Sequence, residues 1–404
     1  MNTPSFFMKW LRDLKADQLE NGGVPHVIPH VLKPGDHSAC GWGDAAVICP
    51  WTLYLCYGDT RILEEHYESM VKWVEHIRSI AEDGLIWNTG FHFGDWLAID
   101  AKEGSYFGAT PNDLTATAFY AYSVSLLVKS AKVLHKLEDA ERYLRLHENI
   151  VTAFRKEFFT PAGRLAVPTQ TAHVLALMFD LAEEKDRKRT VDTLVKYLEE
   201  NKWHHTTGFL GTPYLCHVLS SNGRIDAAYR LLMETDYPSW LYPVTKGATT
   251  IWEHWDGLKP DGSFWSADMN SFNHYAYGAI GDWLYRVVAG IDVDETVPGY
   301  KQIILRPQPD TRLQWAAAEF ESMFGPIRSK WCLENGQMQI DVTIPHNTTA
   351  EVILPRARKE NLAGYDKVFD NNLICSGSAE TDEGLLLELG SGNYSFKYPF
   401  TVTG

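Results

Sequence analysis

The hydrophobic pattern of this 404-residue chain changes its period near Gly290, and this change limits the folds open to it. From Ser5 to that point, apolar residues recur every three or four positions, which is typical of helices that bury one face. The clearest example steps by four, three, four and three residues through Leu63, Tyr67, Met70, Val74 and Ile77. Further helices are predicted over 114–134, 140–158, 167–181, 187–201, 225–233 and 272–288.

After Gly290 apolar and polar residues alternate, as in Met338, Ile340, Val342 and Ile344. Period-two runs bounded by turn signals such as Asn335-Gly336 predict antiparallel strands and hairpins. We therefore expect a mainly α fold over 1–295, built from α-hairpins that close into a bundle or toroid, and a small antiparallel β-sandwich over 296–404.

Charge and hydropathy exclude several classes of partner. The 37 basic and 52 acidic residues give a net charge of −15, which disfavours nucleic acid and anionic lipid surfaces. No apolar stretch is long enough to span a bilayer, and the first residues lack the pattern of a signal peptide, so residence in the cytoplasm is the default prediction. The sequence does not indicate an oligomeric state.

Four loop-like segments over 41–45, 91–96, 247–256 and 271–275 combine aromatic residues with carboxylates, histidines or amides. Hydrolysis of a glycoside needs this mixture, because carboxylates activate water, aromatic faces cover the C–H side of a sugar ring, and polar side chains bind hydroxyls. The chain has 14 Trp in all, and core packing is the default for most of them. The segments contain the candidate residues Trp42, Asp44, Asp95, Trp96, Trp252, Glu253, Trp255 and His274.

Structural roles compete with these functional ones. Asp44 precedes an apolar helix-like run and could equally be an N-cap. His274 could equally be a buried histidine at a helix start, whereas an acid between Trp252 and Trp255 favours a functional Glu253. No HExxH motif, compact histidine cluster, P-loop or GxGxxG motif is present, so neither a metal nor a cofactor is predicted.

In order along the chain, these segments resemble the α-L-rhamnosidase family of glycoside hydrolases. The resemblance runs from about Pro4 to Gly325 and includes Gly41-Trp42-Gly43-Asp44-Ala45, Gly94-Asp95-Trp96-Leu97, Gly208-Phe209-Leu210-Gly211-Thr212-Pro213, Thr249-Thr250-Ile251-Trp252-Glu253 and Phe272-Asn273-His274-Tyr275. Each motif alone is weak, but their order and separations make the match specific.

The resemblance implies an α/α six-barrel catalytic domain followed by a β-sandwich, and removal of terminal α-L-rhamnose from small or oligosaccharide rhamnosides with inversion. Glu253 matches the general base, Trp42 and Trp96 match aromatic walls of the rhamnose pocket, and His274 matches a contact to sugar hydroxyls. Asp44 and Asp95 lie inside the same motifs and are included as substrate-binding candidates.

One family motif has no counterpart in this chain. Family members carry an Asp-Glu-Arg stretch, which supplies the general acid, shortly before the segment that matches Pro4, and this chain begins at Met1. We therefore expect the C-terminal portion of such an enzyme, with its first barrel helices and acid motif upstream. A non-catalytic glycan-binding remnant and another α/α-barrel exo-glycosidase are the alternatives, and a polysaccharide lyase is disfavoured because the loops lack a basic clamp.

Overall fold

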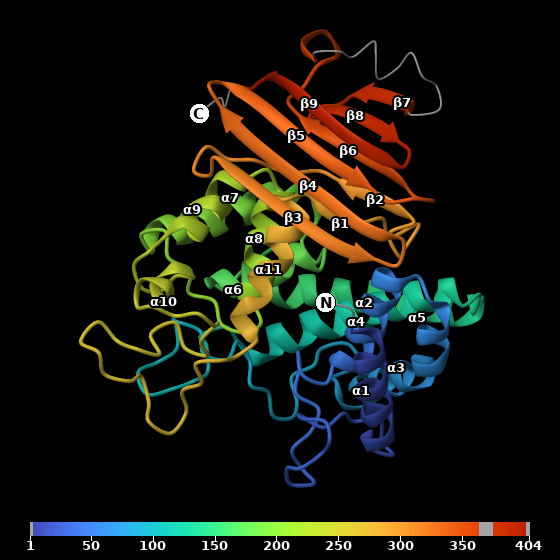
Figure 1. Ribbon diagram of the computed structural model, residues 1–404. Helices are drawn as coiled ribbons and strands as arrows, with labels where there is room; N and C mark the ends of the chain where they lie inside the picture. Colours follow the sequence, from blue (N-terminus) through green and yellow to red (C-terminus); the bar gives the residue numbers. More distant parts are fainter. Residues whose placement is uncertain (1–2, 363–374, 401–404) are drawn as a thin grey trace. The chain divides into compact units, whose positions relative to one another are not determined.

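The computed structural model describes residues 3–362 and 375–400, which form two compact units (Figure 1). The helical unit comprises Ser5–Thr52 and Thr60–Ala279, and the sheet unit comprises Met1–Pro4, Leu53–Asp59 and Ile280–Gly404. The chain thus passes for the last time from one unit to the other between Ala279 and Ile280. The domain boundary at 295/296 stays a prediction.

Helices dominate the chain up to Ala279. Their bounds are α1 (Pro4–Asp17), α2 (Ala45–Tyr57), α3 (Thr60–Ile80), α4 (Asn112–Val133), α5 (Leu137–Phe158), α6 (Gln170–Met178), α7 (Glu184–Glu200), α8 (Thr212–Ser221), α9 (Ile225–Met233), α10 (Leu241–Thr245) and the 3₁₀ turn η1 (Ala276–Ala279). The predicted helices up to residue 233 are confirmed, with α6 shorter than expected. The helix expected over 272–288 is confirmed in part: it begins only at Ala276, and it consists of three short pieces, η1, α11 (Ile280–Trp283) and the π-helical turn η2 (Leu284–Val288).

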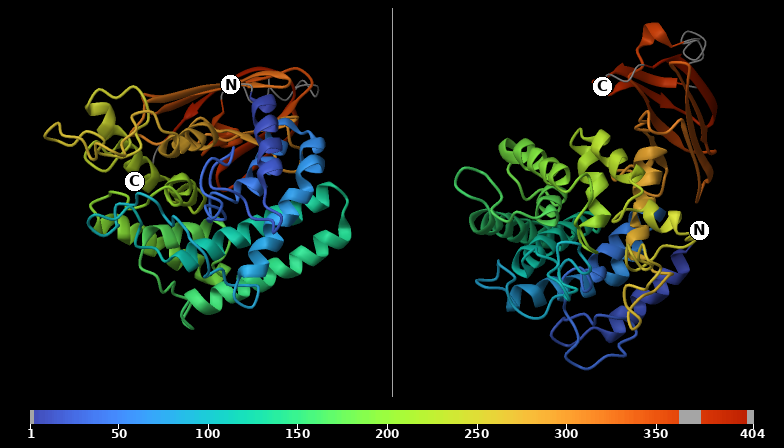
Figure 2. Two further views of the ribbon diagram at one scale, coloured as in Figure 1. Left: turned by 90° about the horizontal axis from the view of Figure 1, so that it is seen from below. Right: turned by 90° about the vertical axis from the view of Figure 1, so that its left-hand side faces the viewer.

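Burial separates these helices into an inner and an outer layer. In α4, 15 of 22 residues are buried, around the whole helix, whereas α5 buries only 7 of 22, along one face. A helix that is buried on all sides must lie inside the fold. Among the inner helices, α4 contacts α6, and α6 contacts α8. On the outside, α5 packs on α4, α7 on α6, and α9 on α8. The long α4–α5 hairpin is the blue-green pair in Figure 2.

Short connections alternate with long ones around the inner layer. The segments 134–136, 179–183 and 222–224 join α4 to α5, α6 to α7 and α8 to α9, and connections this short make antiparallel hairpins. All three inner helices therefore begin at the same end, where the long segments 81–111, 159–169 and 201–211 gather. We call this the loop end of the helical unit, and segment 246–275 joins it through side-chain contacts described below (Figure 1, lower left).

The sheet unit is a two-layer sandwich, as predicted. One sheet has the order β1-β2-β6-β8-β7 and the other β3-β4-β5-β9. The strands are β1 (Ile291–Val293), β2 (Gln302–Leu305), β3 (Trp315–Ser322), β4 (Gly325–Glu334), β5 (Gln337–Ile344), β6 (Thr349–Pro355), β7 (Cys375–Glu380), β8 (Gly384–Leu389) and β9 (Gly392–Pro399).

One pair of strands departs from the expected antiparallel arrangement. β2 and β6 run parallel, with Ile303 opposite Ala350, while the other pairs of described strands are antiparallel. The pairing skips over β3, β4 and β5 in the chain, so no hairpin turn dictates its direction. The buried face of each sheet is apolar, with Trp331, Ile340 and Phe396 on one and Val352 and Leu387 on the other.

Candidate active site

Trp42 and Trp96 lie in one aromatic cluster at the loop end, although 54 residues separate them in the chain. Phe93 connects them, since its ring centroid lies 4.6 Å from that of Trp42 and 5.6 Å from that of Trp96. Trp96 also lies 5.1 Å from Tyr106. Both tryptophans keep part of their surface exposed, so they can offer a ring face to a ligand.

Asp44, two residues after Trp42, is completely buried. Its Oδ1 accepts hydrogen bonds from Trp73 Nε1 (2.9 Å) and Ser123 Oγ (2.6 Å), and its Oδ2 accepts one from the Gly41 backbone N–H (2.7 Å). Burial raises the pKa of Asp44, and the hydrogen bonds from Ser123, Trp73 and Gly41 oppose that rise. These bonds fix the loop that carries Trp42 to α3 and α4. A direct contact between Asp44 and a sugar stays a prediction.

Asp95 occupies a similar position in the next loop. Its carboxylate accepts backbone N–H bonds from Gly208 (2.8 Å), Leu210 (2.8 Å) and Gly211 (3.0 Å), and a hydroxyl bond from Thr171. Burial raises its pKa and the four hydrogen bonds oppose that rise. The Gly-Phe-Leu-Gly motif at 208–211 therefore wraps around Asp95, and this contact holds segment 201–211 against the loop of Trp96.

Gly208 allows the two segments to approach this closely. A Cβ atom at residue 208 would collide with the Trp96 carbonyl oxygen, and the next residue, Phe209, donates its N–H to that oxygen at 2.9 Å. Asp95 is 1% exposed, so its contact to a sugar also stays a prediction, and its observed contacts are those of a residue that positions Trp96.

Glu253 is held in a different way. Its backbone N–H donates to the Ser271 carbonyl oxygen at 2.8 Å, and its Oε2 accepts the Ser271 N–H at 2.9 Å. The second carboxylate oxygen, Oε1, lies 4.0 Å from His274 Nε2, and the side chain is 14% exposed. A separation of 4.0 Å is too long for a hydrogen bond, so Oε1 can accept a proton or a hydrogen bond from another molecule.

His274 faces Glu253 through a nitrogen that carries its proton. Its Nδ1 accepts the N–H of Ala276 at 3.2 Å, where η1 begins, so the neutral ring has its hydrogen on Nε2. The backbone N–H of His274 donates to the Ile251 carbonyl oxygen at 2.9 Å, which ties the two segments of the site together. The side chain is 33% exposed, and its ring packs 5.2 Å from that of Phe209.

Trp252 and Trp255 lie behind Glu253. They are 5% and 4% exposed, and Trp255 stacks on Tyr277 at 3.9 Å and lies 4.4 Å from His205. Trp252 packs edge-to-face with Phe272 at 5.0 Å, and both tryptophans line a small hollow of about 40 Å³. These contacts support the Glu253 loop, and a contact of either tryptophan with a sugar stays a prediction.

Sequence reasoning missed two aromatic residues that connect the loops. Trp265 stacks on His254 at 3.8 Å and lies 5.6 Å from Tyr106, which in turn packs on Trp96. This chain of rings joins segment 246–275 to segment 81–111. The only sequence signal for it is the presence of aromatic residues in loops, which does not identify their partners.

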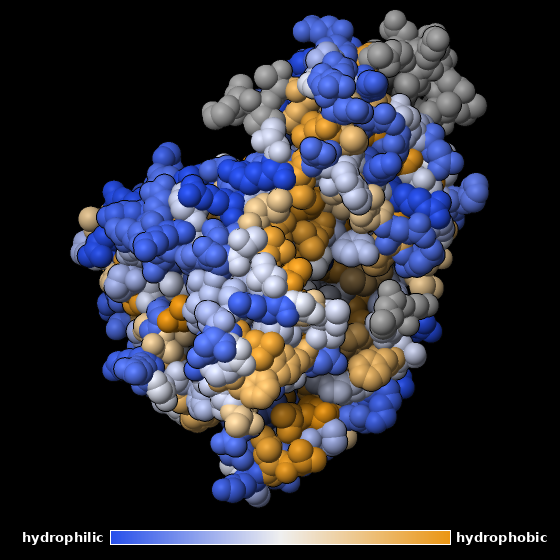
Figure 3. Space-filling model, turned by 60° about the vertical axis from the view of Figure 1, so that its left-hand side comes forward, coloured by the Kyte–Doolittle hydropathy of each residue, from blue (hydrophilic) through white to orange (hydrophobic). Residues whose placement is uncertain are grey.

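Exposed hydrophobic side chains also gather at the loop end, including Phe91, Phe107, Phe264 and Tyr275. Figure 3 shows one side of the surface, where apolar patches lie among hydrophilic residues.

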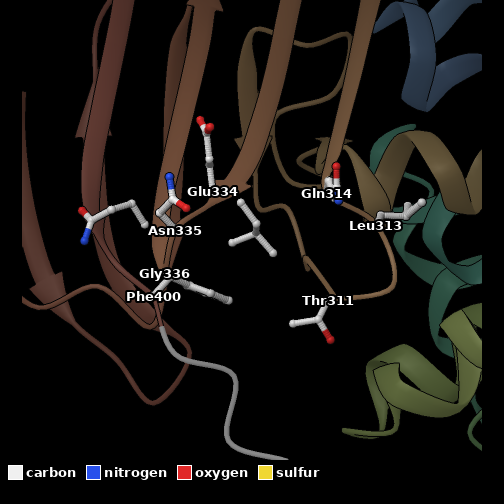
Figure 4. Close-up of a pocket in the computed structure, with 9 residues that line it drawn as sticks. Thr311, Leu313, Gln314, Glu334, Asn335, Gly336 and Phe400 are labelled. Carbon is white, nitrogen blue, oxygen red and sulfur yellow. The ribbon is translucent and has the colours of Figure 1, made fainter.

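The sheet unit has a hollow of its own, of about 240 Å³, between Leu313, Gln314, Asn335 and Phe400 (Figure 4). None of the predicted site residues lines that hollow.

The sequence matches two domain families of known enzymes. Residues 1–288 match the bacterial alpha-L-rhamnosidase 6 hairpin glycosidase domain, and residues 290–369 match the bacterial alpha-L-rhamnosidase C-terminal domain. The chain belongs to the bacterial α-L-rhamnosidase family. The six-hairpin glycosidase fold and the C-terminal sandwich predicted from the sequence are thus confirmed.

Individual α-L-rhamnosidases match most of this chain. An α-L-rhamnosidase of Streptomyces avermitilis is 38% identical over 397 residues, which are 98% of this chain and 36% of the relative. The structure of a Streptomyces avermitilis α-L-rhamnosidase complexed with L-rhamnose superposes with a TM-score of 0.88 at 36% identity. The superposition covers 98% of this chain and 36% of the Streptomyces chain. The structure of an Aspergillus terreus α-L-rhamnosidase superposes with a TM-score of 0.89 at 33% identity. This superposition covers 98% of this chain and 43% of the Aspergillus chain.

The chain therefore spans less than half the length of these α-L-rhamnosidases. Among the described residues, no helix has both the length and the apolar character needed to cross a membrane.

Proposed function

We propose that this chain carries the general base and the rhamnose-binding walls of an inverting α-L-rhamnosidase, acting on terminal α-L-rhamnosides. The observation that carries the proposal is the pairing of Glu253 with His274 at the loop end. Glu253 combines one anchored oxygen with one open oxygen, and such a carboxylate can orient a water molecule and take its proton.

Each candidate side chain has a separate part in the proposed reaction. The Ser271 N–H fixes Oε2 of Glu253 and so leaves Oε1 to accept the proton of the attacking water. His274 Nε2–H points into the same space and can donate a hydrogen bond to a sugar hydroxyl. Trp42 and Trp96 supply faces for the C–H side of the ring.

An inverting glycosidase also needs a carboxylic acid about 6.5 to 9.5 Å from the base, to protonate the leaving oxygen. Asp44 and Asp95 are poor candidates for that acid, because both are buried and every hydrogen bond described for them is used to hold a loop. The proposal therefore assigns the general acid to another carboxyl group of the enzyme.

The proposal is tested by following the hydrolysis of an aryl α-L-rhamnoside by NMR. Inversion requires that β-L-rhamnose is the first anomer to form, ahead of mutarotation. If α-L-rhamnose forms first, the enzyme retains configuration and Glu253 is not the base of an inverting reaction. Binding of L-rhamnose without any turnover would favour a glycan-binding protein over an enzyme.

A further inference from the structure

His92 is a buried residue that joins the two segments carrying Trp42 and Trp96. Its Nδ1 accepts the backbone N–H of Cys40 at 3.1 Å, two residues before Trp42 in the chain. His92 itself lies four residues before Trp96, in the segment that also contains Phe93. A single imidazole therefore ties the backbone beside one tryptophan to the loop of the other.

The second ring nitrogen and a neighbouring tryptophan hold this imidazole in one orientation. Its Nε2 donates to the Thr89 carbonyl oxygen at 3.0 Å, and its ring packs edge-to-face on Trp87, with 4.7 Å between the centroids. Trp87 is completely buried, and its backbone N–H donates to Thr117 Oγ1 in α4 at 3.0 Å. The ring of His92 therefore cannot turn without breaking two hydrogen bonds, and it packs on a residue that is bound to an inner helix.

His92 can hold both segments only as a neutral ring. A neutral imidazole has one donor and one acceptor, and these match the Thr89 carbonyl oxygen and the Cys40 N–H. Burial lowers the pKa of His92 to about 4, and nearby His26 adds to this effect, whereas the bond to Thr89 opposes it. At neutral pH the ring is uncharged, so Nδ1 remains an acceptor.

The next backbone N–H in the chain, that of Gly41, has a partner of a different kind. It donates to Asp44, whose carboxylate also accepts hydrogen bonds from side chains of α3 and α4. One amide thus fixes the segment to the helices, and its neighbour at Cys40 fixes the segment to the loop of Trp96. Loss of the second bond should therefore shift Trp42 relative to Trp96 and leave the helices in place.

We propose that His92 is a positioning residue for terminal rhamnose, because its bond to the segment of Trp42 sets the separation between that ring and the ring of Trp96. A ring face attracts a sugar only at van der Waals distance, so a small shift of either ring removes part of the contact. The hydrogen bonds that hold Glu253 and His274 involve other segments, so His92 acts on sugar binding and not on proton transfer. This inference rests on the proposed function and adds to it the residue that sets the geometry of its aromatic walls.

Two amide substitutions separate the two ring nitrogens. The side-chain oxygen of asparagine lies as many bonds from Cβ as Nδ1 of histidine, so His92→Asn can keep the acceptor for Cys40. The amide nitrogen of glutamine matches Nε2, so His92→Gln can keep the donor to Thr89 but loses the acceptor at Nδ1. His173→Gln is the matched control, because His173 is 1% exposed, has a pKa that burial also lowers to about 4, and bonds to Thr169 at the start of α6.

Calorimetry with methyl α-L-rhamnoside measures the affinity of each variant, and thermal unfolding measures its stability. We expect His92→Gln to weaken binding about tenfold and His92→Asn to bind like the parent protein. His173→Gln should lose stability and keep the affinity of the parent. With an aryl α-L-rhamnoside, His92→Gln should raise KM and leave kcat unchanged, as expected when a contact made equally in the ground state and the transition state is lost.

Three results would contradict the role of His92. Equal affinity in His92→Asn and His92→Gln overturns the inference and leaves the proposed function intact. Failure of His92→Gln to fold overturns it as well, because the acceptor at Nδ1 would then be needed for the helical unit as a whole. A parent protein that does not bind methyl α-L-rhamnoside overturns the proposed function, and this inference with it.

Discussion

The loops around Asp95 and Glu253 use a carboxylate in opposite ways. Asp95 is buried and accepts four hydrogen bonds, three of them from the backbone of a single segment. Glu253 accepts one backbone N–H on one oxygen and leaves the other oxygen 4.0 Å from His274. Both acids lie inside motifs that resemble the same family, yet only Glu253 has a free acceptor and some exposed surface.

This difference separates the construction of the site from its chemistry. A buried carboxylate with all its acceptor capacity in use organises backbone, because releasing any donor would leave that donor unsatisfied. A partly exposed carboxylate with one free oxygen can exchange a proton with water or substrate. Substitutions should therefore separate the two roles, because loss of the first carboxylate affects stability and loss of the second affects chemistry.

Removing the Asp95 carboxylate should destabilise the helical unit strongly. Asp95→Ala leaves four donors without an acceptor, and we expect the free energy of unfolding to fall by roughly 4 kcal/mol. Urea unfolding measures this loss. Asp192→Ala is the control, because its exposed pairing with Lys188 should contribute about 0.5 kcal/mol or less. A loss below about 1 kcal/mol in Asp95→Ala would contradict the positioning role.

Acid should affect the helical unit before the sheet unit. Burial lowers the pKa of His92 and His173 to about 4 and of His205 to about 3, against 6.5 in the unfolded chain. The unfolded state therefore binds more protons below pH 6.5, so stability falls as the pH drops from 6.5 towards 4, by up to about 1.4 kcal/mol per pH unit for each histidine.

The sheet unit contains one histidine in its sequence, His346, and it is exposed. Hydrogen exchange at pH 7 and pH 5, corrected for the intrinsic effect of pH, should show loss of protection in α4, α6 and α8 before any loss in β4 and β5. An equal loss in both units would show that these histidines do not set the acid sensitivity.

The partly exposed tryptophans should contribute to affinity more than to stability. We expect Trp96→Ala to weaken the binding of methyl α-L-rhamnoside about tenfold, because one ring face is lost from the aromatic cluster. Calorimetry gives the affinity, and Trp315→Ala, at a tryptophan of the sheet unit that is 60% exposed, is the control. Unchanged affinity in Trp96→Ala would remove this ring from the proposed pocket.

The smallest effect is expected in the aromatic packing behind Glu253. His205 lies between the rings of Trp240 and Trp255, and within the described part of the chain its ring nitrogens have no stronger polar contact than a weak one to the backbone of Thr207. His205→Phe keeps an aromatic ring and removes these poorly paired nitrogens, so stability should rise by roughly 1 kcal/mol at neutral pH and should fall less steeply as the pH is lowered. Thermal unfolding at several pH values measures both effects, and a large loss of stability would show that a ring nitrogen is paired after all.

The sequence could predict the elements that expose one face to water. α3, α5, α7 and α9 are amphipathic, and their period is visible along the chain. The inner helices α4 and α6 are buried on more than one face and were predicted as well, whereas the ten-residue α8 was not predicted separately. The parallel pairing of β2 with β6 was missed because alternation identifies a strand but not its neighbour.

The same limit applies to the site. The motifs drew attention to both acids and to Trp252 and Trp255, but residue type does not reveal burial. Only the fold shows that Glu253 has a free oxygen while Asp95 has none, and that Trp96 keeps an exposed surface while Trp255 is covered by Tyr277. The contacts that decide these roles join segments more than 100 residues apart in the case of Asp95.

The most direct test of the account is the turnover of an aryl α-L-rhamnoside by Glu253→Gln, measured together with its melting temperature. Asp268→Asn, at an exposed acid in the same loop, is the control. We predict a fall in turnover of about 10² to 10⁴ with an unchanged melting temperature, since the amide keeps the shape and loses the base. Turnover equal to that of the parent protein would contradict the assignment of Glu253 and the distinction drawn here between the two carboxylates.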